Sequence, residues 1–206
     1  MGKWKFVGGA IAIDFVNTIG GRTEKSIDNY FIRDDQFNHC NDIVDWAEAI
    51  RLIGSTTARK IKAWISEHPE YAKKKFEHAK AFRETLYRML RRSMKNMKMI
   101  ATDMELLNKA CAAARKNQRI VYRSGNFSWE FDVQEYNPDM IMHHVAIAAA
   151  DLLTSEKLLQ LKQCKGEDCG WLFIDSSKNR KRVWCDMKDC GNLAKVRRFR
   201  SKQKLN

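Results

Sequence analysis

Four cysteines near the C-terminal end of the chain have the spacing of a metal site. Cys164, Cys169, Cys185 and Cys190 follow the pattern C-x4-C-x15-C-x4-C. Two close pairs, each on its own tight turn, can place four thiolate sulfurs at about 2.3 Å from one Zn2+ ion. Because the protein fills all four positions, none remains for water or a substrate. We therefore predict one structural zinc ion, which would contribute on the order of 10–16 kcal/mol to folding a small segment.

Two disulfides are the alternative interpretation of these four cysteines. The first six residues lack the pattern of a secretory signal, and Cys40 and Cys111 lie far apart in the chain. Unpaired cysteines are typical of the reducing cytosol, where closely spaced cysteines more often bind metal. No apolar run approaches the roughly 20 residues of a membrane span. We expect a cytoplasmic protein that does not enter a membrane.

Positive charge is concentrated around the cysteines. The 206-residue chain has a formal net charge of +13. Residues 164–206 hold 12 Lys and Arg against 5 Asp and Glu, whereas residues 1–163 hold 26 against 20. This concentration favours contact with a phosphate backbone over a general role in solubility. A basic tail that only carries solvated charge is the alternative.

The cysteine segment is predicted to contain a hairpin and a helix. Residues 171–175 and 183–185 are expected to pair as strands across a polar turn, and residues 192–202 to form a helix. Three apolar residues of this helix are expected to pack on the zinc core: Leu193, Val196 and Phe199. The residues predicted to contact DNA lie on the helix and at the hairpin tip: Arg180, Lys181, Arg182, Asn192, Lys195, Arg197, Arg198 and Arg200.

The first 160 residues are predicted to form a helix-rich α+β domain. The apolar segment at residues 10–18 is interpreted as a buried strand, although a short buried helix fits the same pattern. Helical patterns cover residues 41–52, 55–67, 70–98, 103–116 and 138–153, with Gly54 as the stop of the first. Alternating residues 119–133 around Ser124–Asn126 predict a hairpin.

A polar cluster interrupts the apolar patterns of this domain. Asp14, Asn17 and Thr18 lie on the N-terminal apolar segment, and Arg83 lies on the core-facing stripe of a helix. A charge in a core must find a partner, and Asp14 is the first candidate for Arg83. One interpretation is a pocket in which the four residues hold a small anionic ligand. The other is a buried ion pair, with the polar side chains bonded to backbone groups.

Catalytic motifs are missing from the sequence. It contains no glycine-rich phosphate loop, no nucleophile elbow and no suitably spaced pair of carboxylates. His143 and His144 are adjacent on a predicted helix, about 100° apart, and so cannot easily share a metal. We expect a protein that is not an enzyme.

Two segments resemble known families. Residues 169–175, 184–187, 190–192 and 194–198 closely resemble the CGNR zinc finger, and residues 9–18 are similar to the start of the ABATE domain. The resemblance implies a bacterial, stress-induced transcription regulator, with a sensor domain at residues 1–160 and a treble-clef-like zinc finger at residues 161–206. The finger is taken as the DNA-binding part. Leu193 stands where the family has its name-giving arginine.

These observations together favour a DNA-binding transcription regulator. Its expected partners are double-stranded DNA, a small-molecule effector for the N-terminal domain and a second copy of the chain, since single basic modules gain specificity by dimerising. The alternative is a zinc module whose basic helix binds RNA or an acidic protein partner.

Overall fold

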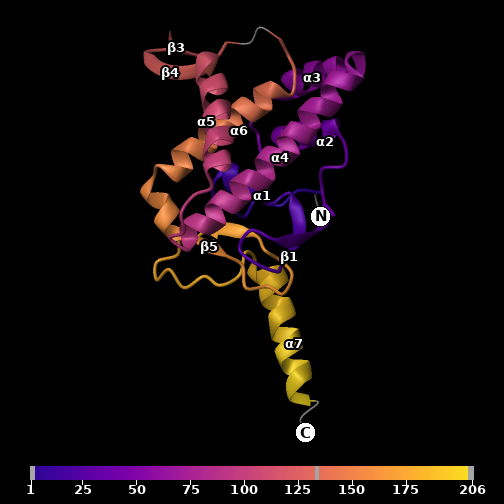
Figure 1. Ribbon diagram of the computed structural model, residues 1–206, viewed down its shortest axis with the longest axis vertical. Helices are drawn as coiled ribbons and strands as arrows, with labels where there is room; N and C mark the ends of the chain where they lie inside the picture. The colour runs from indigo at the N-terminus through magenta and orange to yellow at the C-terminus, as the bar shows by residue number, and fades with distance from the viewer. Residues whose placement is uncertain (1–2, 133–134, 204–206) are drawn as a thin grey trace.

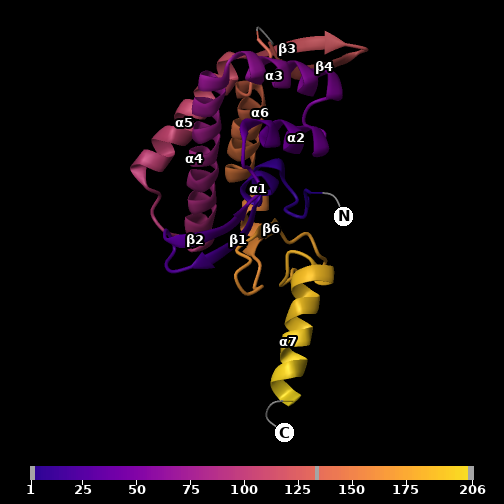
Figure 2. The same cartoon turned by 90° about the vertical axis from the view of Figure 1, so that its right-hand side faces the viewer.

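The structure, a computed structural model, describes residues 3–132 and 135–203. Helix α7 projects from one end of a helical body, and the hairpin β3–β4 lies at the other end (Figures 1 and 2). The α-helices are α1 (Ile11–Val16), α2 (Cys40–Ala49), α3 (Ser55–Glu67), α4 (Pro69–Met94), α5 (Ala101–Lys116), α6 (Asp139–Leu153) and α7 (Asn192–Gln203). The strands are β1 (Ile19–Glu24), β2 (Tyr30–Asp35), β3 (Gln118–Arg123), β4 (Asn126–Phe131), β5 (Leu161–Gln163) and β6 (Leu172–Ile174). Two single helical turns complete the chain, η1 (Glu156–Gln160) and η2 (Met187–Gly191).

Helix α1 lies inside the fold, in contact with α4, α6 and β6. Its residues Ala12, Ile13, Phe15 and Val16 are fully buried. The strand that we predicted here is wrong, and the short buried helix that fits the same pattern is present. An element that is apolar on every side has no amphipathic period, so its sequence does not distinguish a helix from a strand.

The five amphipathic helices predicted between residues 41 and 153 are confirmed as α2–α6. Helix α2 ends at Ala49 because Arg51 adopts a left-handed conformation with φ 61°. Gly54 is therefore not its stop, and instead precedes α3. Helix α4 begins at Pro69. Proline lacks an N–H, which costs nothing in the first turn of a helix because N–H groups there have no intrahelical acceptor. Helix α4 ends at Met94, before the expected end.

The hairpin predicted over residues 119–133 is confirmed as β3 and β4. Its two-residue turn, Ser124–Gly125, has φ values of 51° and 82°. Two successive positive φ values match the right-handed twist of the flanking strands, and glycine adopts the second without steric cost. Val133, the expected end of the second strand, lies outside the described residues.

The hairpin predicted between residues 171–175 and 183–185 is wrong. Strand β6 pairs instead with β5, with Leu161 opposite Ile174. The chain after β6 folds around the buried carboxylate of Asp175, which accepts hydrogen bonds from the amide of Arg182 at 2.9 Å and from the Lys162 ammonium at 2.6 Å. The adjacent Lys162 ammonium lowers the pKa of Asp175. Because Asp175 binds these donors, the chain after β6 forms a loop around its carboxylate where we had predicted a second strand.

Buried hydrogen bonds join the cysteine segment to the helical body. The side-chain amide of Asn17 donates to the carbonyl of Leu172 at 2.8 Å and accepts from the amide of the same residue at 3.0 Å. The amide of Ile174 donates to the carbonyl of Gly8 at 2.8 Å. The indole of Trp171 also donates to a backbone carbonyl of the body. Strand β6 is thus built into the body.

The fold class is as expected, a helix-rich α+β protein with small antiparallel hairpins and a C-terminal cluster of four cysteines. Among the described residues, every helix is too short or too polar to cross a lipid bilayer.

Asn17 offers a test of the contact between body and cysteine segment. Replacing Asn17 by Leu would leave the buried N–H and C=O groups of Leu172 without partners, so the free energy of unfolding should fall by about 2–4 kcal/mol. Urea unfolding followed by circular dichroism would measure the loss. Asn108→Leu, at an exposed position of α5, is the matched control. Equal stability of the two variants would contradict the assigned contact.

Candidate metal centre and nucleic-acid interface

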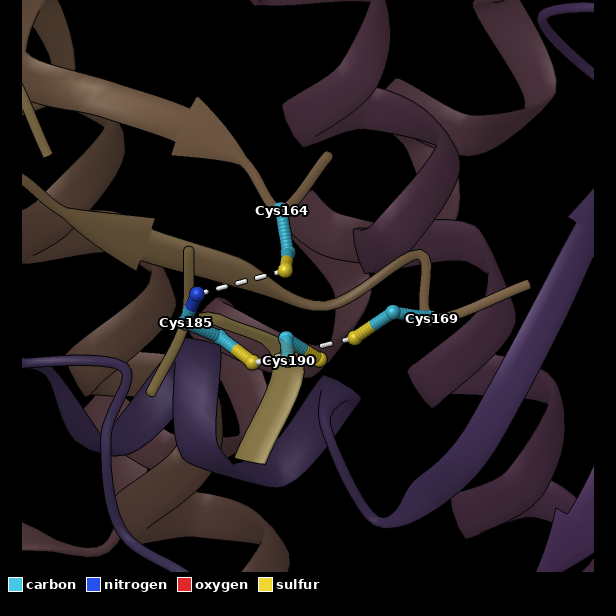
Figure 3. A group of neighbouring side chains, drawn as sticks. All are labelled: Cys164, Cys169, Cys185 and Cys190. Atoms are coloured by element: carbon cyan, nitrogen blue, oxygen red, sulfur yellow. Dashed lines mark hydrogen bonds between the residues drawn. The ribbon is translucent and has the colours of Figure 1, made fainter. Parts of the chain in front are cut away.

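The four cysteine sulfurs converge on one point (Figure 3). All lie within 4.8 Å of one another, with 3.7 Å between the sulfurs of Cys169 and Cys185 and 3.6 Å between those of Cys185 and Cys190. A tetrahedron with metal–sulfur bonds of about 2.3 Å has edges of about 3.8 Å. The donor set and its spacing therefore fit one zinc ion held by four thiolates.

The first pair of cysteines lies on a tight turn that glycine makes possible. A Cβ atom on Gly166 would lie 2.8 Å from the sulfur of Cys190. The amides of Gly166 and Cys185 donate to the sulfur of Cys164 at 3.3 and 3.2 Å. Hydrogen bonds from the neighbouring Cys169 and Cys185 thiols, together with these amides, lower the pKa of the Cys164 thiol. The two amide donors thus stabilise Cys164 as the thiolate that zinc requires.

The hairpin β1–β2 braces this turn from the body. The amide of Arg22 donates to the carbonyl of Cys169 at 3.2 Å. Thr23 and Arg33 bond the carboxylate of Asp168 at 2.9 and 2.8 Å. Gly170 has φ 67°, and an added Cβ would lie 2.7 Å from the Cβ of Arg22, so no larger residue fits between the two segments.

The second pair of cysteines leads directly into α7. Turn η2 contains Cys190, and the carboxylate of Asp186 caps it by accepting from the amide of Lys188 at 2.8 Å. Helix α7 starts at Asn192, as predicted. The side-chain amide of Asn192 donates to the carbonyl of Lys188 at 3.0 Å. The zinc site therefore sets the direction in which α7 leaves the body (Figure 2).

The apolar residues of α7 do not pack on the zinc core, contrary to our prediction. Leu193, Val196 and Phe199 are 56, 46 and 62% exposed. The helix extends into solvent beyond its first turn (Figures 1 and 2). The exposed Leu193, which replaces the family's arginine, lies in the first turn.

The structure gives the predicted DNA-contacting residues different surroundings. Lys195, Arg198 and Arg200 are exposed on α7, and Arg197 pairs with Glu167 at 2.5 Å. Contact of any of these residues with DNA stays a prediction.

The basic residues that follow β6 also differ in exposure. Arg180 and Lys181 lie exposed in the loop. Arg182 is not at a free tip, because its guanidinium donates to the carbonyls of Trp184, at 2.9 Å, and Cys185, and lies over the ring of Phe173 at 4.2 Å. Arg182 therefore supports the fold of the second cysteine pair.

The buried Arg83 forms ion pairs with Asp35, at two N–O distances of 2.8 Å, and with Glu84 at 2.9 Å. It also donates to the hydroxyl of Thr18 at 3.1 Å. The partner that we predicted, Asp14, is wrong, since its carboxylate accepts from the amide of Gly8 at 2.8 Å. Asp35 ends β2, and the turn between β1 and β2 brings it back beside α4.

All four residues of the predicted ligand cluster have protein partners. Burial raises the pKa of Asp14 to about 6, against the opposing effect of hydrogen bonds from the amides of Gly8 and Val7. Asn17 bonds β6, and Thr18 lies between Arg83 and the carbonyl of Phe15. These contacts agree with the second interpretation, in which Arg83 forms a buried ion pair and the polar side chains bond backbone groups. Ligand binding by the cluster stays a prediction.

A surface cavity of about 470 Å3 between α4, α5 and α6 was not foreseen from the sequence. Its apolar lining includes Ala79, Phe82, Leu106, Ala110 and Met142. Four titratable nitrogen groups also line it, on Lys75, His78, Lys109 and His143, together with the carboxylate of Asp139, which pairs with Lys75. Burial lowers the pKa of His143. Small residues on facing helices were the signal in the sequence.

The metal site can be tested by removing one ligand. Cys169→Ser should lower the zinc content from one ion per chain to well below one, since three thiolates bind zinc far more weakly than four. Zinc measured by mass spectrometry on purified protein would check this. Cys111→Ser, a cysteine outside the cluster, should keep one zinc ion. A full zinc content in the Cys169 variant would contradict the four-thiolate site.

Comparison with protein-family models gave two matches, and comparison with curated proteins gave none. Residues 160–203 match the CGNR zinc finger, whose name agrees with the geometry of the four cysteines. Residues 9–156, more than half of the chain, match ABATE, which is described as "Putative stress-induced transcription regulator". Both matches agree with the resemblance seen in the sequence. The chain therefore belongs to the ABATE family and carries a CGNR zinc finger as its zinc-binding unit.

Proposed function

We propose that this protein regulates transcription by binding duplex DNA through α7, and that its role is binding and not catalysis. The observation that carries the proposal is the position of α7, which leaves the zinc site, extends into solvent and exposes Lys195, Arg198 and Arg200. Figure 1 shows no other element beside the outer part of the helix. A rigidly held, solvent-exposed cationic helix is the form in which many small modules approach DNA.

The two sides of α7 suit different parts of a duplex. At 100° per residue, Lys195 and Arg198 lie about 60° apart on one side of the helix, whereas Leu193, Val196 and Phe199 follow another side. Cations of the first side would bind phosphates, which gives affinity without sequence information. Apolar side chains in the major groove can contact thymine methyl groups. The exposure of Leu193, Val196 and Phe199 is thereby consistent with base contact.

Reversing two charges of α7 tests the DNA interface. Lys195→Glu combined with Arg198→Glu should weaken binding to a mixed-sequence duplex of about 20 base pairs by about 100-fold and reduce the log–log salt slope by about 0.9 for each lost phosphate contact. Fluorescence anisotropy at several salt concentrations would measure both quantities. Arg59→Glu combined with Lys73→Glu, on exposed positions of α3 and α4, carries the same change in net charge and should bind normally.

Further variants and competitors separate the alternatives. Leu193→Arg restores the family's cation at an exposed position and should strengthen duplex binding several-fold. A structured RNA hairpin and a polyglutamate peptide, used as competitors, test the RNA and acidic-protein alternatives. Unchanged duplex binding by the double charge-reversal variant, at a normal zinc content, would contradict the proposed interface.

The cavity between α4, α5 and α6 is the site that we propose for an effector. Its volume of about 470 Å3 is in the range of small-molecule sites. Apolar walls with nearby lysine and histidine nitrogens suit an amphipathic carboxylate. Helix α4 links the cavity to the zinc site, because Phe82 lines the cavity and the hydroxyl of Tyr87 donates to the carbonyl of Gly170 at 2.8 Å. A ligand that shifts α4 would therefore change a contact of the first cysteine turn.

Filling the cavity tests the effector site. Ala110→Trp places a large side chain in the lining and should lower the affinity for decanoate, used as an amphipathic carboxylate probe, at least about tenfold. Isothermal titration calorimetry would measure it. Ala112→Trp, on an exposed position of the same helix outside the lining, is the matched control. Decanoate binding that is equal in both variants would remove the cavity from consideration.

A further inference from the structure

The hairpin of β3 and β4, called the arm below, exposes four large apolar side chains. Ile120 is 59% exposed, Tyr122 62%, Phe127 77% and Trp129 58%. The strand register pairs Ile120 with Trp129 and Tyr122 with Phe127, so all four lie on one face. Together they leave about 500–600 Å2 of apolar surface in water, which is at the upper end for a monomeric protein.

The opposite face of the arm is ionic. Arg119 pairs with Asp132 at 3.3 Å, and Arg123 pairs with Glu130 at 3.1 Å. The arm is therefore amphipathic, with one face suited to water and the other to an apolar partner. A two-stranded hairpin is only marginally stable by itself, and it gains from a surface that covers its apolar face.

The apolar face continues into a groove at the base of the arm. This groove has a volume of about 490 Å3. Its lining includes the apolar side chains of Trp129, Phe131, Leu52, Ile147 and Ala148 and the carboxylates of Glu130 and Asp151. Phe131 is held in place by His144, with ring centroids 4.4 Å apart. The apolar side of the arm and the groove thus lie on the same face of the chain.

We propose that a second copy of this chain covers this face, with the apolar sides of the two arms packed together and each arm tip over the other copy's groove. Four side chains from each copy would bury about 1,000–1,200 Å2, which reaches the roughly 1,000 Å2 of a specific interface before the groove is counted. A surface that holds both a projection and a matching groove is self-complementary, as a two-fold interface requires.

Charge favours this face over the apolar side of α7. Each chain has a net charge of +13, so two copies repel each other, and a contact that brings no further like charges together adds least to that repulsion. The four apolar side chains of the arm carry no charge, whereas two α7 helices would bring Arg197 and Arg200 of both copies together. The arm also lies at the end of the molecule opposite α7, so the contact leaves α7 exposed (Figure 1).

Sedimentation equilibrium of the zinc-loaded full chain, under reducing conditions and without DNA, tests the proposal. The wild-type protein should be a dimer at micromolar concentration. Phe127→Glu places a charge on the apolar face and should raise the dissociation constant at least about 100-fold. Ser128→Glu, the next residue but on the ionic face, should remain dimeric. Circular dichroism and zinc content confirm that both variants are folded.

Three outcomes would overturn the proposal. One is a wild-type protein that is monomeric at about 100 μM, which would leave the apolar face to a different protein. The second is an unchanged dimer in Phe127→Glu. The third is loss of the dimer in Val196→Glu with retention in Phe127→Glu, which would place the contact on α7. Duplex binding enters none of these measurements, so failure of the dimer and failure of the DNA interface are distinguishable.

Discussion

Four thiolates around one metal ion are the constraint on which the C-terminal part of this protein depends. Besides the cysteines, the buried apolar cluster at this site contains only Trp171 and Phe173 among the described residues, and β5 and β6 have three residues each. So small a core does not hold a segment together without a metal or disulfides. The zinc ion must join the two cysteine pairs, and the second pair sets the direction of α7.

Buried polar contacts then make the zinc unit and the helical body one piece. Asn17 satisfies both backbone groups of Leu172, Tyr87 bonds Gly170, and Arg22 bonds Cys169. Separating the two parts would break these hydrogen bonds, and each buried polar group left without a partner would cost free energy. Through these contacts the first cysteine turn is bonded directly to α4 and to the hairpin β1–β2.

Local patterns were a good guide where one face of an element is buried and the other is wet. The amphipathic helices α2–α6 have such faces, and their sequences predicted them. The hairpin β3–β4 was predicted from its alternating residues and its turn, although both of its faces are largely exposed. The pattern failed for α1, which is buried on every side, and for residues 183–185, where a buried Asp175 holds the chain in a loop. It also failed for α7, because apolar spacing indicates a shared face but not whether another element covers that face.

The sequence by itself determined the metal site, since thiolate chemistry and ligand spacing are local properties of the chain, and it determined the cationic character of α7. Only the tertiary structure decided the partner of Arg83. Asp35 lies 48 residues before Arg83 in the chain, and the turn between β1 and β2 brings it close. The tertiary structure also decided that the apolar faces of α7 and of the arm remain in water. The physical reason is that burial and ion pairing depend on which segments meet in space, and those meetings arise from the packing of the whole chain.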